Sequence, residues 1–263
     1  YFTMHALIND LAKFVSGEFC LILEDDNLTA DRNICRVRHV SSMNFCNQRT
    51  QNLGALYEAK HLHGFLRLHS VHFLRLGKKS IDLLLVLPYL RVLKLQDQDI
   101  VELPSSIGDL KQLRHLDVSQ TSITELPDKV CNLYNLQTLL LEDCHQLIQL
   151  PSELGRLINF PHLNIKGTEI KQMPAGMCDL KNLQTLSDFV VDKQTSQRIA
   201  ELKELQHLRQ DLTISGVGNI DHEGNALEAD IMSNKEYLDK IVLTWRKGDD
   251  DASMLECNPS AED

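Results

Sequence analysis

A leucine pattern that restarts about every 23 residues is the feature that most limits how this chain can fold. The frames begin at Leu87, Leu110, Leu133, Leu157 and Leu180, so successive starts differ by 23, 23, 24 and 23 residues. Each frame places further apolar residues at fixed offsets, and four of the frames contain Leu-Pro or Met-Pro. A period of ~20–50 residues is typical of chains built from stacked, similar units. The pattern therefore predicts a solenoid.

Within each frame, the alternation of apolar and polar residues predicts one short strand. In the segment LRHLDVSQ, Leu116 and Val118 point to one side of the strand, and His115, Asp117 and Ser119 point to the other. One such strand per unit stacks into a parallel sheet. The spacing matches the leucine-rich repeat, whose period is ~20–29 residues. We therefore expect an α/β solenoid, a leucine-rich-repeat horseshoe with a parallel β-sheet on its concave face.

Two further positions of the frame predict structural roles. Thr121, Cys144 and Thr168 follow the strand, where an inward hydroxyl or thiol can bond to the backbone of the turn. The proline-containing pairs mark the outer, convex segment, because proline there removes no N–H group from the sheet. These pairs are Leu103-Pro104, Leu126-Pro127, Leu150-Pro151 and Met173-Pro174.

The solenoid is expected to extend beyond its regular part. The frames are most regular over residues 87–188, and we expect the solenoid to occupy residues 32–263. A longer helical segment follows the last regular frame. Outside the regular part, the pattern indicates degenerate early units at 35–41 and 63–68, and strands at 211–215 and 240–244.

Residues 1–31 do not repeat. An apolar stripe at helical spacing ends at Gly17, and Phe19 to Leu23 has the pattern of a short strand. This head is either a cap on the first unit or the end of a separate domain.

Composition narrows the possible partners. The chain has 27 Lys and Arg residues against 37 Asp and Glu residues, a formal net charge of −10. A chain with that balance has no overall basic field for nucleic acid. Apolar runs such as 81–87 are far shorter than the ~18 residues that span a bilayer, so we expect no membrane span and a cytoplasmic protein. The start at Tyr1 and the acidic end suggest a piece of a longer chain.

The cysteines are expected to be reduced thiols. Seven cysteines are scattered without a CxxC motif, at positions 20, 35, 46, 131, 144, 178 and 257. Cys131 and Cys178 occupy the frame position of Gly108 and Gly155, so we interpret them as small core fillers.

No motif predicts a metal site or catalysis in this chain. His61, His63, His69 and His72 crowd one stretch but match no zinc spacing. The acidic runs 24–26 and 249–251 lack the spacing of a calcium loop. The GxxxxGK[ST] phosphate loop is absent, and Gly216-Val217-Gly218 is too short for a dinucleotide fingerprint.

The outward side chains of the four central strands form the predicted interaction surface. A rigid face of mixed charge recognises macromolecules by shape and complementary charge. The predicted concave-face residues are Val92, Lys94, Gln96, His115, Asp117, Ser119, Thr138, Leu140, Glu142, His162, Asn164 and Lys166.

The head and the repeats together resemble one protein family. MHALINDLAKFVSGEF resembles the end of the winged-helix subdomain in the nucleotide-binding (NB-ARC) module of plant coiled-coil NLR immune receptors. ELPSSIGDLKQLRHLDVSQTSITELP, LYNLQTLLLEDC and LQTLSDFVV resemble the leucine-rich region of these receptors. The specific part is the order, in which a Met-His helix start is followed by a linker and then by such repeats. By this resemblance, residues 1–31 are a short winged-helix remnant.

The resemblance implies a nucleotide-controlled switch in the full-length protein. In the family, a Met-His-Asp motif lies against bound ADP, and its histidine touches the diphosphate. Met4 and His5 match this motif, whereas Ala6 replaces the aspartate. We hypothesise a loosened resting state or a decayed gene copy, and a receptor carrying Ala6→Asp should signal less spontaneously. This chain alone is expected to hold no cofactor, and ADP or ATP would bind in the full-length receptor.

The resemblance also implies partners and leaves two alternatives open. The repeats would hold the switch closed against the receptor's own nucleotide-binding module, and would sense pathogen effectors or guarded host proteins. One alternative is an intracellular scaffold that binds a signalling protein without any nucleotide switch. The other is part of an enzyme with an ATPase module upstream of Tyr1.

Overall fold

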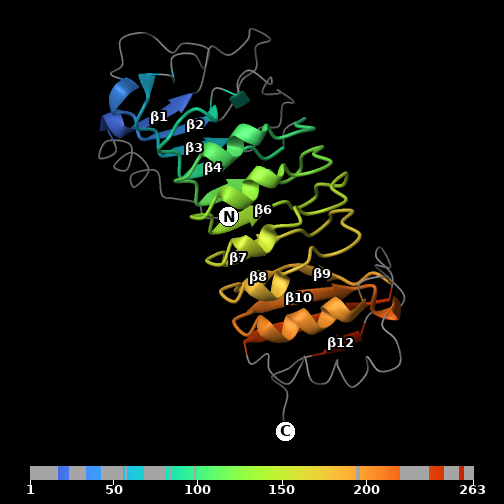
Figure 1. Cartoon of the computed structure of the whole chain (residues 1–263). Coiled ribbons are helices and arrows are strands. Elements are labelled where there is room, and N and C mark those ends of the chain that lie inside the picture. Colours follow the sequence, from blue (N-terminus) through green and yellow to red (C-terminus); the bar gives the residue numbers. More distant parts are fainter. Residues whose placement is uncertain are drawn as a thin grey trace, which may run out of the picture.

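The chain winds through successive coils, and the short strands of the described coils form two sheets (Figure 1). The computed structural model describes residues 17–23, 34–42, 56, 58–67, 81–82, 84–97, 99–193, 196–219, 237–245 and 255–257. No helix in these ranges has the length and apolar character needed to cross a membrane.

Eight parallel strands form the first sheet, in the order β1-β2-β3-β4-β5-β6-β7-β8. Because each coil pairs with the next in chain order, the predicted parallel sheet is confirmed. Its strands are β1 (Cys20–Leu23), β2 (His39–Ser42), β3 (Gly64–Arg67), β4 (Val92–Lys94), β5 (His115–Asp117), β6 (Thr138–Leu140), β7 (His162–Asn164) and β8 (Thr185–Leu186).

A second sheet of four strands, in the order β12-β11-β10-β9, continues the stack. Its strands are β9 (Asp188–Val190), β10 (Gln210–Ser215), β11 (Leu238–Thr244) and β12 (Leu255–Cys257). Only the pairing of β11 with β12 is antiparallel among the described strands. The early units and late strands expected from the sequence are found as β2, β3, β10 and β11.

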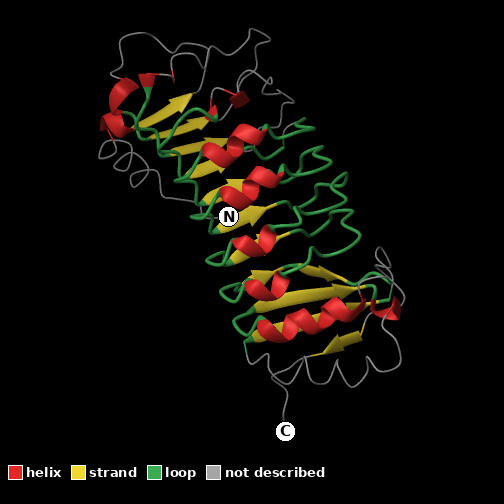
Figure 2. Cartoon of the chain, viewed as in Figure 1, coloured by secondary structure: helices red, strands yellow, loops and turns green. Residues whose placement is uncertain are grey.

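Short 3-10 helices cover one face of the stacked strands (Figure 2). In the coils of η4 and η5, a proline in extended conformation immediately precedes the helix. The longest is η8, which confirms the expected longer helical segment. These helices are η1 (Gly17–Phe19), η2 (Ile34–Arg36), η4 (Ser105–Asp109), η5 (Asp128–Asn132), η6 (Leu154–Arg156), η7 (Met177–Asp179), η8 (Ser196–Glu204) and η9 (Val217–Asn219).

The core contains a spine of leucines in register. Leu93 pairs with Leu116, Leu116 with Leu139, and Leu139 with Leu163 along the sheet. Each of these side chains is at most 1% exposed. Burial of one leucine side chain stabilises a fold by about 1.5–3 kcal/mol, so the spine is a main source of stability. The predicted direction of the apolar side chains is confirmed.

Inward polar groups close the turn after the strand, as predicted. The Thr121 hydroxyl donates to the carbonyl of Val118 at 2.7 Å, and the Thr168 hydroxyl donates to the carbonyl of Ile165 at 2.7 Å. The Cys144 thiol donates to the carbonyl of Val118 at 3.2 Å, so it bonds to the preceding coil. These three side chains are buried, and their polar groups are satisfied by backbone carbonyls of the turn.

The sheet begins before the predicted domain boundary at residue 32. Strand β1 pairs in parallel with β2, with Leu21 opposite Val40. The short strand expected at 19–23 is therefore the first strand of the solenoid sheet. The expected helical stripe before Gly17 lies outside the described residues, and so do Met4, His5 and Ala6.

A local irregularity at Ser187 separates the two sheets. The Ser187 hydroxyl accepts the N–H of Ile165 at 2.8 Å, while its carbonyl accepts the N–H of Thr213 at 2.9 Å. In the preceding coils the equivalent N–H groups, those of Val118 and Leu141, donate to backbone carbonyls. A side chain here replaces a backbone acceptor, so the chain continues from one sheet to the other without leaving the N–H of Ile165 unpaired.

Candidate interaction surface

The structure places the predicted concave-face residues at three equivalent positions of four successive coils. The first row contains Val92, His115, Thr138 and His162, which pair in register. The second row contains Lys94, Asp117, Leu140 and Asn164, which also pair in register. The third row, Gln96, Ser119, Glu142 and Lys166, lies two residues further along each coil.

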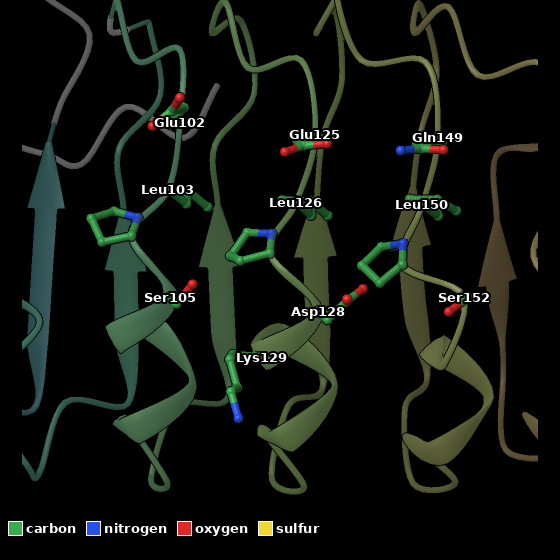
Figure 3. Close-up of a pocket in the computed structure, with 13 residues that line it drawn as sticks. Glu102, Leu103, Ser105, Glu125, Leu126, Asp128, Lys129, Gln149, Leu150 and Ser152 are labelled. Atoms are coloured by element: carbon green, nitrogen blue, oxygen red, sulfur yellow. The ribbon is translucent and has the colours of Figure 1, made fainter.

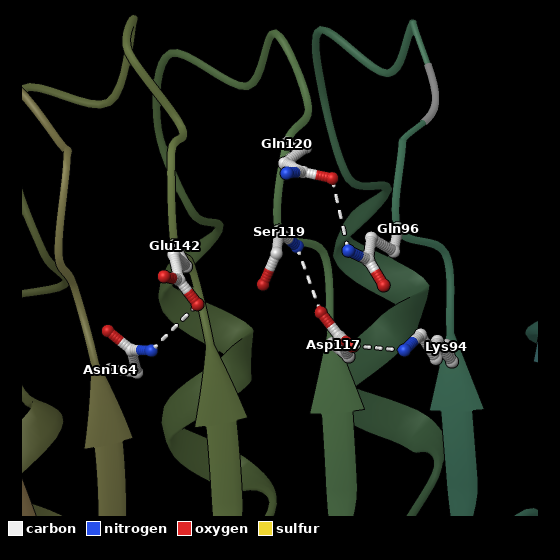
Figure 4. A network of polar contacts seen from close by, with 7 residues as sticks. All are labelled: Lys94, Gln96, Asp117, Ser119, Gln120, Glu142 and Asn164. Carbon is white, nitrogen blue, oxygen red and sulfur yellow. Dashed lines mark hydrogen bonds and ion pairs between the residues drawn. The ribbon is translucent and has the colours of Figure 1, made fainter. Parts of the chain in front are cut away.

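Two of these residues are buried. Asp117 is 3% exposed and Ser119 is 5% exposed, whereas Lys166 is exposed and the other predicted residues are half-buried. The Lys94 ammonium lies 3.3 Å from Asp117 Oδ2, and the Ser119 N–H donates to Asp117 Oδ1 at 3.1 Å (Figure 4). Asp117 therefore joins two coils, and its carboxylate is largely withdrawn from any partner.

Other side chains on this face are also joined across coils. The Asn164 amide donates to Glu142 Oε2 at 3.2 Å, and the Gln96 amide donates to Gln120 Oε1 at 3.0 Å (Figure 4). Cross-coil bonds of this kind restrict rotamers before any partner arrives, which lowers the ordering cost of binding. Gln120 was not among the predicted residues; its left-handed φ of 58° brings it to the exposed end of this network.

The charge of the face comes from its lysines and carboxylates. Burial lowers the pKa of His115 below its ordinary value; nearby Lys94 lowers this pKa further, and Asp117 opposes the shift. The His115 imidazole is therefore largely neutral at pH 7. Lys94, Glu142 and Lys166 supply charge of both signs that a partner can contact.

A groove of about 700 Å³ crosses three coils at the proline-containing convex segment (Figure 3). Glu102 and Glu125 form an isolated parallel backbone bridge, which brings these two residues into register. Gln149 occupies the equivalent place in the next coil (Figure 3). The sequence reasoning identified the Leu-Pro pairs but not this polar row. Its signal is the residue immediately before each Leu-Pro pair.

The described histidines and acids do not form a metal centre. Among the described residues, no group of three or more His, Cys, Asp or Glu side chains is arranged to hold a metal ion. His61 and His63 belong to the described part of the chain, whereas His69, His72 and the acidic runs 24–26 and 249–251 lie outside it.

The buried thiols have the properties of core fillers. Cys131 is buried, as expected, and Cys178 is half-buried. Burial, with the nearby Asp128 carboxylate adding to it, raises the pKa of the Cys131 thiol to about 11. Burial also raises the pKa of Cys178, with smaller effects from Glu201 and Asp179.

Cys131 is therefore expected to resist thiol reagents in the folded chain. Because the pKa rises from 9.0 to about 11, the thiolate fraction of Cys131 at pH 8 should be about a hundredfold below that of an unperturbed cysteine. Exposed Cys20 and Cys35 should react before Cys131 when labelling with iodoacetamide is followed by peptide mass spectrometry. Because the unfolded thiol loses its proton at lower pH than the folded one, the free energy of unfolding should also fall between about pH 9 and 11. Labelling of Cys131 as fast as Cys35 would contradict its burial.

Comparison with protein families identifies the repeat region. A family model described as "Leucine-rich repeat region" matches residues 39–148 and 67–253. A candidate disease resistance protein of Arabidopsis thaliana is 48% identical over 248 residues, covering 93% of this chain and 17% of that protein. The candidate disease resistance RPP13-like protein 1 of the same plant is 44% identical over 253 residues, covering 94% of this chain and 24% of that protein. The chain thus spans a quarter or less of these relatives.

Solved structures share the fold. An internalin (inlF) of Listeria monocytogenes superposes with a TM-score of 0.59 at 19% identity, covering 80% of this chain and 56% of that chain. Internalin C2 of the same bacterium gives a TM-score of 0.57 at 22% identity, covering 80% of this chain and 82% of that chain. At such low identity the likeness supports the fold alone.

Proposed function

The chain belongs to the leucine-rich repeat family, and because it matches plant disease resistance proteins over nearly its whole length, we propose that it is a protein-recognition module of plant defence. Its concave face binds protein partners. The one observation that carries this proposal is that polar side chains of this face are joined between coils, Lys94 to Asp117, Asn164 to Glu142 and Gln96 to Gln120. A surface arranged in this way has little freedom to lose on binding.

The finer proposal concerns autoinhibition and recognition. The module holds the full-length receptor inactive by contacting the receptor's own nucleotide-binding module. A pathogen effector or a guarded host protein then competes for this contact and shifts the population toward the active state. ADP or ATP is bound by that other module. Met4, His5 and Ala6 would lie next to the nucleotide, and they remain outside the described residues.

A charge swap on the concave face tests the proposal. This chain replaces the corresponding region of the Arabidopsis relative that is 48% identical, and the chimera is expressed in leaves. The double variant Glu142→Lys with Lys166→Glu leaves the net charge of the chain unchanged. It reverses the sign of the charge at each of these two positions on the face. We expect spontaneous cell death, measured as ion leakage, to rise about fivefold or more, because the inhibitory contact loses charge complementarity.

A matched swap on the convex groove serves as the control. Glu125→Lys with Lys129→Glu makes the same exchange within the groove lining and should leave leakage unchanged. Circular dichroism melting of the purified chains checks that both swaps fold. Equal leakage from the two swaps would contradict autoinhibition through the concave face and would favour the scaffold alternative.

A further inference from the structure

A row of basic side chains lies beside the concave face, where the early strands begin. Arg38, His63, Arg91 and Arg114 each immediately precede a strand, from β2 to β5. Backbone hydrogen bonds join these four residues in order. The N–H of His63 donates to the carbonyl of Arg38 at 2.7 Å, and the N–H of Arg91 donates to the carbonyl of His63 at 2.6 Å. The N–H of Arg114 donates to the carbonyl of Arg91 at 2.8 Å. Since neighbouring strands lie ~4.8 Å apart, the row is roughly 14 Å long.

No carboxylate among the described residues forms an ion pair with this row. The described ion pairs involve Lys94, Arg156 and Lys181. Arg38 contacts the His63 ring instead, with 3.5 Å between Arg38 Nη1 and His63 Nε2. Burial lowers the pKa of His63, and the further causes are the cations Arg91 and Arg38 and then His39 and His61. The three arginines therefore make the row a local positive region on a chain whose net charge is −10.

An exposed aromatic residue adjoins this positive region. Tyr89 is 48% exposed although it is a large side chain. The ring of His61 stacks on it with centroids 5.6 Å apart. Tyr89 precedes Arg91 by two residues, both side chains are exposed, and His61 precedes His63 of the row by two residues. Tyrosine and arginine are the residue types enriched at the energetic centres of protein interfaces.

The shape of the row favours an extended polypeptide as its occupant. The groove at the convex segment and the groove beside the turn of Gln120 lie elsewhere, around Glu102 to Ser152 and around Gln120 to Gln146. The row, roughly 14 Å long, matches about four residues of an extended chain, which rises ~3.3 Å per residue. Gln137 and Pro161 occupy the row position in the next two coils, so the basic track ends after Arg114. A track this short on an acidic chain is poorly suited to nucleic acid.

We propose that Arg38, His63, Arg91 and Arg114, with Tyr89 beside them, bind an acidic segment of a partner protein. Glu or Asp side chains of that segment pair with the Arg91 and Arg114 guanidinium groups, which present forked donors suited to carboxylates. This surface is additional to the concave-face residues of the proposed function. A test of peptide binding at this surface can therefore fail or succeed independently of the proposed function of the concave face.

Binding of a labelled peptide to the 263-residue chain tests this surface. The probe is a fluorescein-labelled peptide of alternating Glu and Ser, followed by fluorescence anisotropy. We expect saturable binding that weakens as salt is raised. Arg91→Glu with Arg114→Glu should weaken binding at least about tenfold, because two attractive contacts become repulsive. Arg91→Lys with Arg114→Lys should retain part of the affinity.

The matched control is Lys129→Glu with Lys171→Glu, which changes the net charge equally at exposed positions away from the row. It should bind the peptide nearly as well as the parent chain. Equal weakening by the control variant would overturn the proposal, as would equal binding of a peptide in which Gln replaces Glu. Binding only of inositol hexakisphosphate, single-stranded DNA or phosphatidylserine vesicles, with no binding of the Glu peptide, would also overturn it.

Discussion

Leu139→Ala should lower the free energy of unfolding of this chain by about 3–5 kcal/mol, the range for a fully buried leucine in a core that cannot collapse around the cavity. Leu139 is 0% exposed and lies between Leu116 and Leu163 in the leucine spine. The loss therefore weakens contacts on both sides of the coil, which matters in a fold where each unit is stabilised by its neighbours. Urea denaturation followed by circular dichroism measures the change.

The adjacent residue provides a matched control for this prediction. Leu140 is the same residue type in the same strand, but it points to the concave face and is half-buried. Leu140→Ala should cost only about 1 kcal/mol, because less apolar surface is removed from a buried environment. Similar losses from both substitutions would mean that the strand does not alternate between core and concave face, and the solenoid interpretation would fail.

Gly216→Ala is expected to be the second severe substitution, lowering the free energy of unfolding by about 2–5 kcal/mol. Gly216 has a φ of +82°, and a Cβ atom there would collide with the carbonyl oxygen of Val191. The left-handed conformation costs an alanine about 1–2 kcal/mol, and the steric conflict adds about 1–3 kcal/mol. The Gly216 N–H also donates to Thr244 at 2.9 Å, so relief by backbone movement would disturb the link to β11.

Gly218→Ala tests whether position, and not glycine content, decides this effect. Its φ lies outside the left-handed region, and an added Cβ would meet Trp245 at 3.4 Å, an ordinary contact. We expect a change within about 0.5 kcal/mol, as for other surface substitutions. Thermal unfolding of the two variants in parallel gives the comparison. Equal losses would contradict the role of the left-handed turn at Gly216.

The leucine frames were sufficient to predict the sheet and its core, but not the environment of each polar side chain. Asp117 belongs to the predicted concave face, but its side chain is buried and forms an ion pair with Lys94 of the preceding coil. The basic row escaped sequence reasoning because its members are separated by 25, 28 and 23 residues. Because the segments between these residues differ in length, their alignment is established only when the strands pair. The role of Ser187 also depends on contact between coils, because its hydroxyl accepts the N–H of Ile165 in place of a backbone carbonyl.

The amino-acid sequence alone is enough to predict the repeating strand, the inward leucines and the turn groups of Thr121, Cys144 and Thr168, because alternation and turn chemistry depend on residues close together in the chain. The tertiary structure decided which side chains of different coils meet. It joined Asp117 to Lys94, aligned Glu102 with Glu125, and brought Arg91 next to Arg114. These contacts depend on the register between coils, and that register is set by loop lengths and backbone pairing together, which no single frame contains.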